Sequence, residues 1–344
     1  MKNLLNTVVL LSLLISCTKI PAIPIADHTF GGGVYILNEG NFRGGNGTVS
    51  FYSYDSTKIF NDLFFNINGR HLGDVPNSMI IYSDKAYILV NNSGKIEVVD
   101  QATLVSKATI TGLKSPRNMR IINDNKAYVT SLYSDSVTII NLSSNLISGY
   151  INLRRSSESI VVSGLNAYVS SWMGGKEVMV INTLNDRVVD SIEVGAEPES
   201  MVIDVNRRIW VLCNGGWARQ NVAELDVIYP GTNHVEKKFA FPTLQNSPTS
   251  LAIDGAGLTL YYLDKGVFQL NVNSVDLAYS PLIPESNAYF YKIAINPINS
   301  DIIVTDAVDF VQQGYVLLYK NNGKFVSKDK AGIIPGAMCF KLIY

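Results

Sequence analysis

The sequence predicts an all-β protein, a seven-bladed β-propeller, on the strength of three observations. An apolar signature recurs along the chain, each recurrence is long enough for four short strands, and the two ends of the chain supply complementary parts of one repeat. The composition suits a large core, because 47% of the 344 residues are apolar and only 17% are charged. A disordered chain is therefore excluded.

The recurring signature is a proline followed three residues later by an apolar residue that opens an apolar run, as in Pro76 to Met79. Two of the copies lack the proline and keep the phase. The apolar anchors are Met79, Met119, Ile160, Met201, Leu251, Ile293 and Met338. Their spacings are 40, 41, 41, 50, 42 and 45 residues, a period that is typical of propeller blades. We therefore expect seven units.

Each unit continues with three further runs of strand-like residues. The second run carries an aromatic or bulky residue in one column, such as Tyr87 or Trp210, and Trp210 is expected to lie in the core. A third run follows, as at residues 95–99, and a more polar fourth run closes the unit, as at residues 187–194. The first runs are apolar at consecutive positions, as expected of strands whose two faces both pack against neighbours.

The ends of the chain complement each other. The last copy of the signature, from Pro335, supplies only a first strand, whereas residues 33–38 match a second strand and residues 47–55 a third. We therefore expect the propeller to cover residues 30–344 and to close by pairing its N- and C-terminal strands.

Residues 1–16 have the features of a signal peptide, namely a basic start at Lys2 and an apolar run too short to span a bilayer comfortably. The run ends in Leu-Ile-Ser-Cys17, which resembles the lipobox of bacterial lipoproteins, so Cys17 is expected to be acylated and to become the mature N-terminus. An ordinary signal peptide with an incidental cysteine is the alternative. Residues 17–29, which hold two prolines, are expected to form an extended tether.

Several segments resemble a known family. "KAYVTS" at residues 126–131, "NAYVSS" at 166–171 and the whole of 177–203 resemble the YVTN repeats of bacterial seven-bladed propellers. Residues 34–56, behind a lipobox, resemble exported propeller lipoproteins of Bacteroidetes of the surface-layer, YncE-like type. Some members of that group capture corrinoids such as vitamin B12 at the cell surface and pass them to an outer-membrane transporter.

The resemblance implies a lipid-anchored outer-membrane protein that captures a large nutrient for a TonB-dependent transporter, on the cell surface rather than the periplasmic face. The tether lacks the adjacent acidic pair expected of a surface-export signal, which leaves periplasmic residence open. A nucleic-acid partner is not expected, because a formal charge of -1 gives no positive field to attract a polyanion.

The expected ligand surface lies where second-to-third-strand loops and blade-to-blade connections surround the channel mouth. Aromatic residues in these loops are expected to make apolar contacts, and polar residues to hydrogen-bond the edge of the ligand. Trp172 and Trp217 stand beside glycine pairs that allow close backbone approach. His71 is a further candidate, as a ligand to a cobalt centre. The candidate binding residues are Asn38, Glu39, Phe42, Arg43, Arg117, Tyr133, Trp172, Trp217, Arg219 and Phe310.

Two other functions stay open. The same face is suited to docking a protein of the cell envelope, and Glu158 with Glu199 resembles part of the carboxylate set of a propeller metal hydrolase. Arg117 in the same ring of positions weakens the hydrolase, and the sequence shows no catalytic set, no cofactor motif and no histidine cluster for a metal. Cys213 and Cys339 are expected to be free thiols on separate blades.

Overall fold

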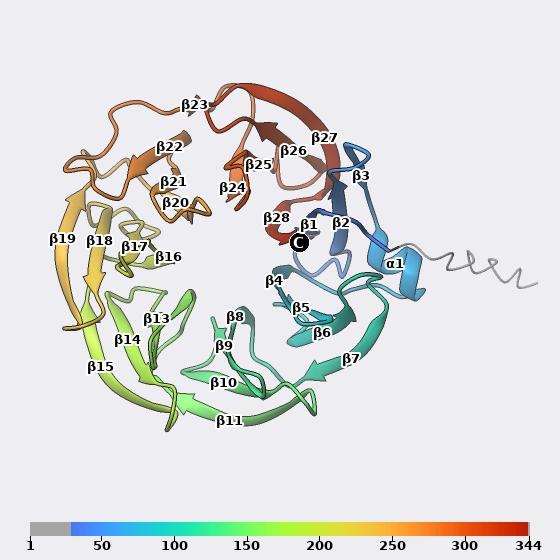
Figure 1. Cartoon of the computed structure of the whole chain (residues 1–344), viewed down its shortest axis with the longest axis horizontal. Helices are drawn as coiled ribbons and strands as arrows, with labels where there is room; N and C mark the ends of the chain where they lie inside the picture. Colours follow the sequence, from blue (N-terminus) through green and yellow to red (C-terminus); the bar gives the residue numbers. More distant parts are fainter. Residues whose placement is uncertain (1–28, 343–344) are drawn as a thin grey trace, which may run out of the picture.

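The computed structural model describes residues 29–342, which form a closed ring of seven four-stranded antiparallel sheets (Figure 1). The all-β prediction and the seven-bladed prediction are confirmed. The signal peptide, Cys17 and all of the tether except Thr29 lie outside the described residues.

The strands of each blade follow one another from the channel to the outer wall. The first strands are β4 (Pro76–Tyr82), β8 (Pro116–Asn123), β12 (Ile160–Ser163), β16 (Pro198–Ile203), β20 (Thr249–Ile253), β24 (Phe290–Ile295) and β28 (Pro335–Lys341). The second strands are β5 (Lys85–Val90), β9 (Lys126–Ser131), β13 (Asn166–Ser170), β17 (Ile209–Cys213), β21 (Thr259–Leu263), β25 (Ile302–Asp306) and β1 (Gly33–Asn38). All seven predicted anchors lie on first strands.

The third strands are mostly buried, and the more polar fourth strands, which form the outer wall, are the more exposed ones. The third strands are β6 (Lys95–Asp100), β10 (Ser136–Asn141), β14 (Glu177–Asn182), β18 (Glu224–Tyr229), β22 (Gly266–Asn271), β26 (Gln313–Tyr319) and β2 (Thr48–Ser53). The fourth strands are β7 (Ser106–Thr111), β11 (Leu146–Asn152), β15 (Arg187–Glu193), β19 (His234–Ala240), β23 (Ile283–Pro284), β27 (Phe325–Ile333) and β3 (Lys58–Phe60).

The ring closes within one blade, as predicted. The C-terminal strand β28 pairs antiparallel with the N-terminal strand β1, and Tyr35 faces Cys339 in that register. The closing sheet has the order β28-β1-β2-β3, so residues from both ends of the chain share one hydrogen-bonded sheet.

The core lies between the blades. The second strands are buried along nearly their whole length, and the aromatic column predicted from the repeats is inside the protein: Tyr87, Tyr128, Tyr168 and Trp210 are each 0–1% exposed. Trp210 packs against Phe239 and donates its indole N–H to Asp204 at 3.0 Å. Cys213 and Cys339 are free thiols.

One helix was not predicted. α1 (Leu63–Asn68) lies between β3 and β4 on the outer edge of the ring (Figure 1). Beyond it, Arg70 donates to the buried carboxylate of Glu97, and the His71 ring packs 4.8 Å from that of Phe65 in the helix. His71 therefore lies beside α1 on the outer edge of the ring and is not among the residues that line the channel cavity, where a ligand to a cobalt centre would be needed.

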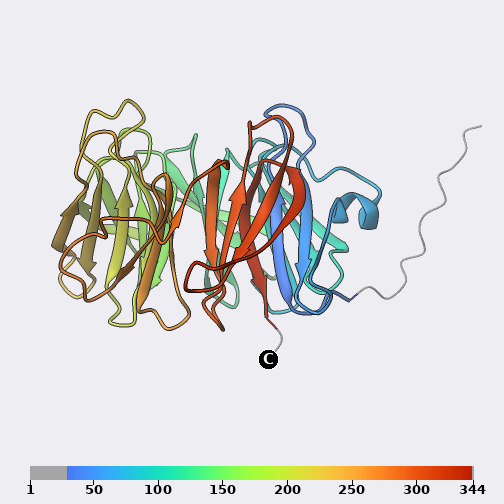
Figure 2. The same cartoon turned by 90° about the horizontal axis from the view of Figure 1, so that it is seen from above.

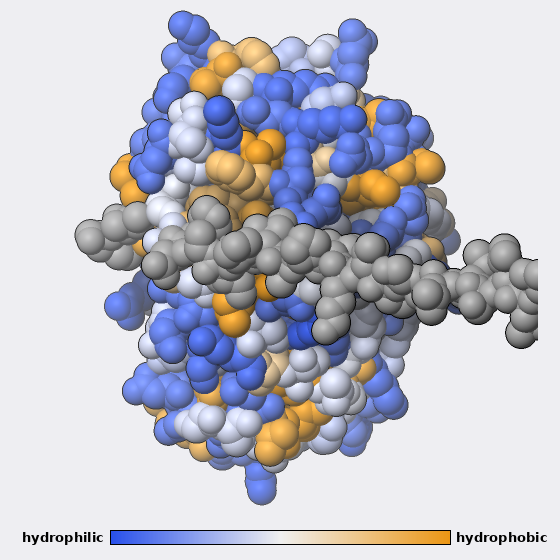
Figure 3. Space-filling model, turned by 90° about the vertical axis from the view of Figure 1, so that its right-hand side faces the viewer, coloured by the Kyte–Doolittle hydropathy of each residue, from blue (hydrophilic) through white to orange (hydrophobic). Residues whose placement is uncertain are grey.

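The alternating strand directions give the ring two distinct faces. Second-to-third-strand loops and blade-to-blade connections emerge where the first strands begin, and we call this the rim face. In Figure 2 the rim face points upward, and the C-terminal strand runs down to the opposite face. The outer wall near α1 is mostly hydrophilic with scattered apolar groups (Figure 3). Within residues 29–342, no helix has both the length and the apolar character needed to cross a bilayer.

Candidate functional site

A cavity of about 410 Å³ occupies the channel and is lined by residues of all seven first strands together with Glu39. It begins at the rim face, because its lining includes the residues that open the first strands, among them Asn77 and Arg117. A pocket of this kind can hold a small molecule or part of a larger one.

One position in each first strand forms a ring at the channel mouth. The seven residues are Asn77, Arg117, Glu158, Glu199, Thr249, Tyr291 and Gly336. The structure brings Asn77, Arg117, Glu158, Glu199 and Tyr291 together in the cavity lining. At Gly336, a Cβ atom would lie only 2.9 Å from Oε1 of Glu39, so the Glu39 side chain occupies the space where a seventh side chain would stand.

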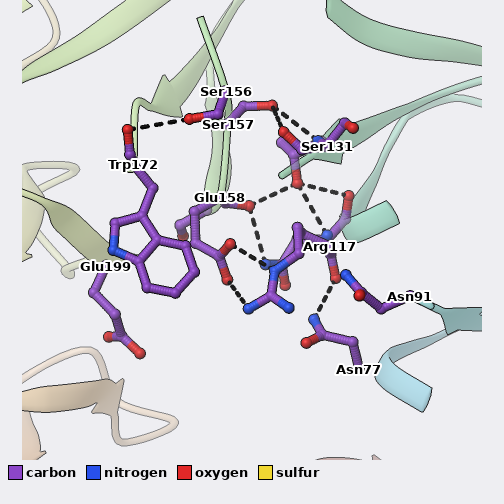
Figure 4. Close-up of polar contacts among 12 residues, drawn as sticks. Asn77, Asn91, Arg117, Ser131, Ser156, Ser157, Glu158, Trp172 and Glu199 are labelled. Carbon is purple, nitrogen blue, oxygen red and sulfur yellow. Dashed lines mark hydrogen bonds and ion pairs between the residues drawn. The ribbon is translucent and has the colours of Figure 1, made fainter. Parts of the chain in front are cut away.

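Arg117, Glu158 and Trp172 lie side by side at the mouth (Figure 4). Arg117 donates two hydrogen bonds to the Glu158 carboxylate, at 2.6 and 2.8 Å, and its guanidinium lies 5.5 Å from the Trp172 ring centroid. Burial alone would favour neutral Arg117, but the negative charge of Glu158 outweighs it and raises the pKa of Arg117. Both charges are therefore fixed in place.

Trp172 follows β13 and is partly buried beside this ion pair. Its carbonyl oxygen accepts a hydrogen bond from Ser156 at 3.1 Å, which anchors the loop. Its indole Nε1 is buried and has no hydrogen-bond partner among the described residues. Buried hydrogen-bond donors in folded proteins nearly always have an acceptor, so this unpaired N–H is an exception that a bound ligand would remove.

Lys292 and Glu199 make a second ion pair across the mouth, with Nζ 3.2 Å from Oε1. Glu199 also accepts the backbone N–H of Ser250 at 3.0 Å. Burial opposes ionisation of Glu199, but these partners hold its pKa below the usual range. Sequence reasoning missed Lys292, although the repeats mark it: the equivalent positions of the other blades hold Ser78, Asn118, Ser159, Ser200, Ser250 and Ala337.

Glu39 and Phe310 meet at the same side of the mouth. Tyr291 donates to Glu39 at 2.8 Å, and burial, only partly offset by this bond, raises the pKa of Glu39. The Phe310 ring packs edge-on against Tyr291 and Tyr289, at 5.5 and 4.9 Å between centroids. The result is a carboxyl group bordered by aromatic rings.

The remaining rim candidates extend outward from the mouth. Trp217 is 95% exposed, and Phe42 and Tyr133 are each 66% exposed. Arg43 lies over the Phe42 ring at 5.3 Å, whereas Arg219 donates to Gln245 in the next connection.

The loops that carry Trp172 and Trp217 are neighbours. Lys176 in the first loop donates to Asn221 in the second at 3.2 Å, and Glu197 accepts the Gly174 N–H at 3.1 Å from the connection between them. The two tryptophans therefore share the rim face, as the sequence predicts.

Asn38 is the exception. It is fully buried, its Nδ2 donates to Thr48 and Ser50, and its Oδ1 accepts the Gly332 N–H at 3.1 Å. The expectation that Asn38 hydrogen-bonds a ligand was wrong, because its amide joins the closing blade to its neighbour.

Exposed apolar side chains are not confined to the rim face. Leu184, in the third-to-fourth-strand connection between β14 and β15 on the opposite face, is 72% exposed, and Tyr279, in the long connection between β22 and β23, is 98% exposed. What distinguishes the rim face is the cavity that its aromatic residues surround, with charged and hydrogen-bonding groups already positioned at the entrance.

Two of the three carboxyl groups at the mouth are paired with cations, Glu158 with Arg117 and Glu199 with Lys292, whereas Glu39 accepts a hydrogen bond from Tyr291. Across residues 29–342, no group of three or more His, Cys, Asp and Glu side chains has the arrangement needed to hold a metal ion. The site offers stacking, cation–π contact and hydrogen bonds, which are the means of binding a ligand.

Comparisons with other proteins agree with this architecture. A family model described as "Domain of unknown function (DUF5074)" matches residues 32–330. No curated protein sequence matches the chain.

Among solved structures, a quinonprotein alcohol dehydrogenase-like protein from Bacteroides thetaiotaomicron is similar, with a TM-score of 0.72 and 16% identity over 91% of this chain and 79% of that one. A putative 6-phosphogluconolactonase from Bacteroides fragilis has a TM-score of 0.68 and 11% identity over 90% and 98%. Hydrazine synthase from Kuenenia stuttgartiensis has a TM-score of 0.61 and 13% identity over 76% and 88%. These likenesses concern the fold alone.

Proposed function

The chain belongs to the family described as Domain of unknown function (DUF5074), and from that premise we propose that it is a binding protein which captures a large amphipathic nutrient on its rim face. The nutrient we propose is a corrinoid such as vitamin B12, as the sequence resemblance implies. The protein is anchored in the outer membrane through Cys17, faces the cell surface, and delivers the ligand to a TonB-dependent transporter.

The observation that carries this proposal is the unpaired indole N–H of Trp172 beside the Arg117–Glu158 pair. This donor is buried by the protein, so an acceptor reaches it only when the Trp172 ring turns; a ligand that turns the ring would satisfy the donor while lying against aromatic surface. Glycines with positive φ flank both rim tryptophans, at Gly174 and at Gly215 and Gly216, and they allow a bulky ligand to approach the backbone.

The size and chemistry of the rim favour a large ligand with an amide-rich or carboxylate-rich edge. Aromatic groups lie both at the mouth, as Phe310, and well outside it, as Trp217, so a ligand that touches both must span several loops. Arg43 is exposed in the loop between β1 and β2, where it can bind polar groups at the edge of the ligand.

The direct test mixes purified protein with cyanocobalamin and follows visible absorbance through a desalting column. We expect the colour to elute with the protein. Colourless protein at micromolar concentrations of both partners would contradict corrinoid capture.

A second candidate is docking of a cell-envelope protein on the same face, favoured by the nearly complete exposure of Trp217. Chemical crosslinking on intact cells, with a photoreactive group placed at Trp217, separates the two. Crosslinks to a transporter that appear only with corrinoid present support capture and delivery, whereas ligand-independent crosslinks support a docking scaffold.

Catalysis is the least favoured function, because a metal hydrolase of this fold would need the carboxylates of Glu158 and Glu199 free. Each is held by a cation at 3.2 Å or less. We propose binding without turnover, which mass spectrometry of the ligand recovered after prolonged incubation tests: an altered ligand would contradict it.

A further inference from the structure

Arg120 stands in a column of the repeat that is otherwise apolar. It follows the apolar anchor of its first strand, and the same position in the other blades holds Ile80, Val161, Val202, Ala252, Ala294 and Cys339. Because the seven blades share one backbone plan, these residues show what packing at that position requires. Packing of the blades therefore does not explain why position 120 holds an arginine.

The Arg120 side chain faces the channel. It is on an innermost strand, flanked by other blades, yet it is exposed and belongs to the lining of the 410 Å³ cavity. Its Nε donates to the carbonyl of Ile160 at 3.0 Å, which directs the guanidinium while leaving the two terminal nitrogens without a partner among the described residues.

The charge of Arg120 is not compensated. The other two cations of the cavity, Arg117 and Lys292, each have a carboxylate partner, whereas no carboxylate within residues 29–342 forms an ion pair with Arg120. Desolvation by the surrounding protein lowers the pKa of Arg120. An unpaired guanidinium that lines the channel presents N–H groups to which an anion can bind.

The walls near Arg120 define what kind of anion fits. At the same level the cavity is lined by Ile80, Val202 and Ala294, with Met338 close by, and these side chains favour apolar groups. A guanidinium presents two parallel N–H groups that match a carboxylate. One cation among aliphatic walls suits an anion that has an apolar body.

We propose that the channel binds a small organic acid, with its carboxylate held by the terminal nitrogens of Arg120 and its apolar part against Ile80, Val202 and Ala294. This site goes beyond rim capture, since it lies deeper in the channel and requires neither Trp172 nor Trp217.

The test compares hexanoate with 1-hexanol, a probe of similar shape without the charge, by isothermal titration of the full-length mature protein. We expect hexanoate to bind about tenfold more tightly, as a charge-assisted hydrogen-bond pair requires. Arg120→Gln should abolish the difference, and Arg120→Lys should retain part of it. Arg187→Gln, which changes an exposed arginine on the outer strand β15, is the matched control and should bind as the original protein does.

Three results would overturn the proposal: equal binding of the two probes, an undiminished preference in Arg120→Gln, or no hexanoate binding up to about 10 mM. Inorganic phosphate that competes as well as hexanoate would also contradict it, because the apolar walls would then play no part. Trp217→Ala should bind hexanoate normally. If the original protein bound hexanoate but no corrinoid, the proposed function would be refuted while the channel site would stand.

Discussion

The guanidinium of Arg117 lies 5.5 Å from the ring centroid of Trp172 while both hydrogen bonds to Glu158 remain intact. One residue thus connects the ion pair of the channel mouth to the aromatic surface of the rim. The first strand of one blade and the loop of the next are joined through it, so these contacts are in place before any ligand arrives.

Removal of Arg117 alone should destabilise the fold. In Arg117→Met the Glu158 carboxylate would stay buried without its cation, and we expect the free energy of unfolding to fall by about 3 kcal/mol. Arg117→Met combined with Glu158→Gln should recover at least half of this loss. Urea unfolding measures both. An equal loss in the single and double variants would show that the stranded Glu158 carboxylate is not the cause of the loss.

Trp172→Phe isolates the indole N–H. The ring and its contact with Arg117 are largely kept, while the unpaired donor is removed, so the stability should stay the same or rise slightly. Corrinoid affinity should fall about tenfold, the effect of one lost hydrogen bond in a dry site. Thermal unfolding and equilibrium titration check the two parts. Unchanged affinity would mean that the ligand does not use this donor.

Gly336→Ala should displace Glu39. The new Cβ would stand 2.9 Å from the Glu39 carboxylate, so the hydrogen bond from Tyr291 should be lost. We expect a cost of about 1–2 kcal/mol, the usual range for overpacking. With Glu39→Ala already present, Gly336→Ala should cost much less, and a double-mutant cycle by urea unfolding measures the difference. If the losses in free energy of unfolding from Gly336→Ala and Glu39→Ala were additive, the proposed steric conflict between residue 336 and Glu39 would be contradicted.

Asp226 and Glu97 hold the same position in their third strands and should respond to pH in opposite directions. Burial, with Glu224 nearby, raises the pKa of Asp226 to about 6, whereas Arg70, Ser106 and Lys95 overcome burial and lower the pKa of Glu97. Stability from Asp226 is therefore full below its unfolded pKa and is lost as the pH rises through about 6. Stability from Glu97 is present above its unfolded pKa and is lost as the pH falls.

Asp226→Asn should accordingly stabilise the protein by about 2 kcal/mol at pH 8 and have little effect at pH 4. Glu97→Gln serves as the comparison. It should lower the free energy of unfolding at pH 7, and this loss should become smaller as the pH falls. Urea unfolding of the three proteins between pH 4 and 8 tests the pair. If the free energy of unfolding changed with pH in the same way in both variants and in the original protein, these two carboxyl groups would not titrate as their surroundings indicate.

The fold was predictable because a repeat reports the same structure seven times. A proline, an apolar anchor and a buried aromatic residue recur at nearly constant spacing. Where one copy departs from this pattern, the other copies still show which strand is expected at that position. α1 occurs only once among the described residues, between β3 and β4, so the comparison of repeats could not predict it.

For the site, the sequence could predict which loops lie on the rim face but not which of their side chains point outward. Topology placed Trp172, Trp217 and Phe310 on one face, but whether a side chain points outward depends on contacts from distant parts of the chain. Asn38 turned inward because Thr48, Ser50 and Gly332 satisfy its amide. Lys292 and Arg120 were detectable in principle, as charged residues in columns of small polar or apolar ones, and aligning the repeats by strand makes such exceptions visible.

The central claim is that a corrinoid is held by the rim face, and equilibrium titration of the Trp172→Ala, Trp217→Ala double variant tests it most directly. Leu184→Ala is the matched control, because Leu184 is also an exposed apolar residue but lies in the β14–β15 connection on the opposite face. The account predicts a loss of at least about 2 kcal/mol in binding for the double variant and none for the control. Equal affinity in the double variant and the control would contradict it.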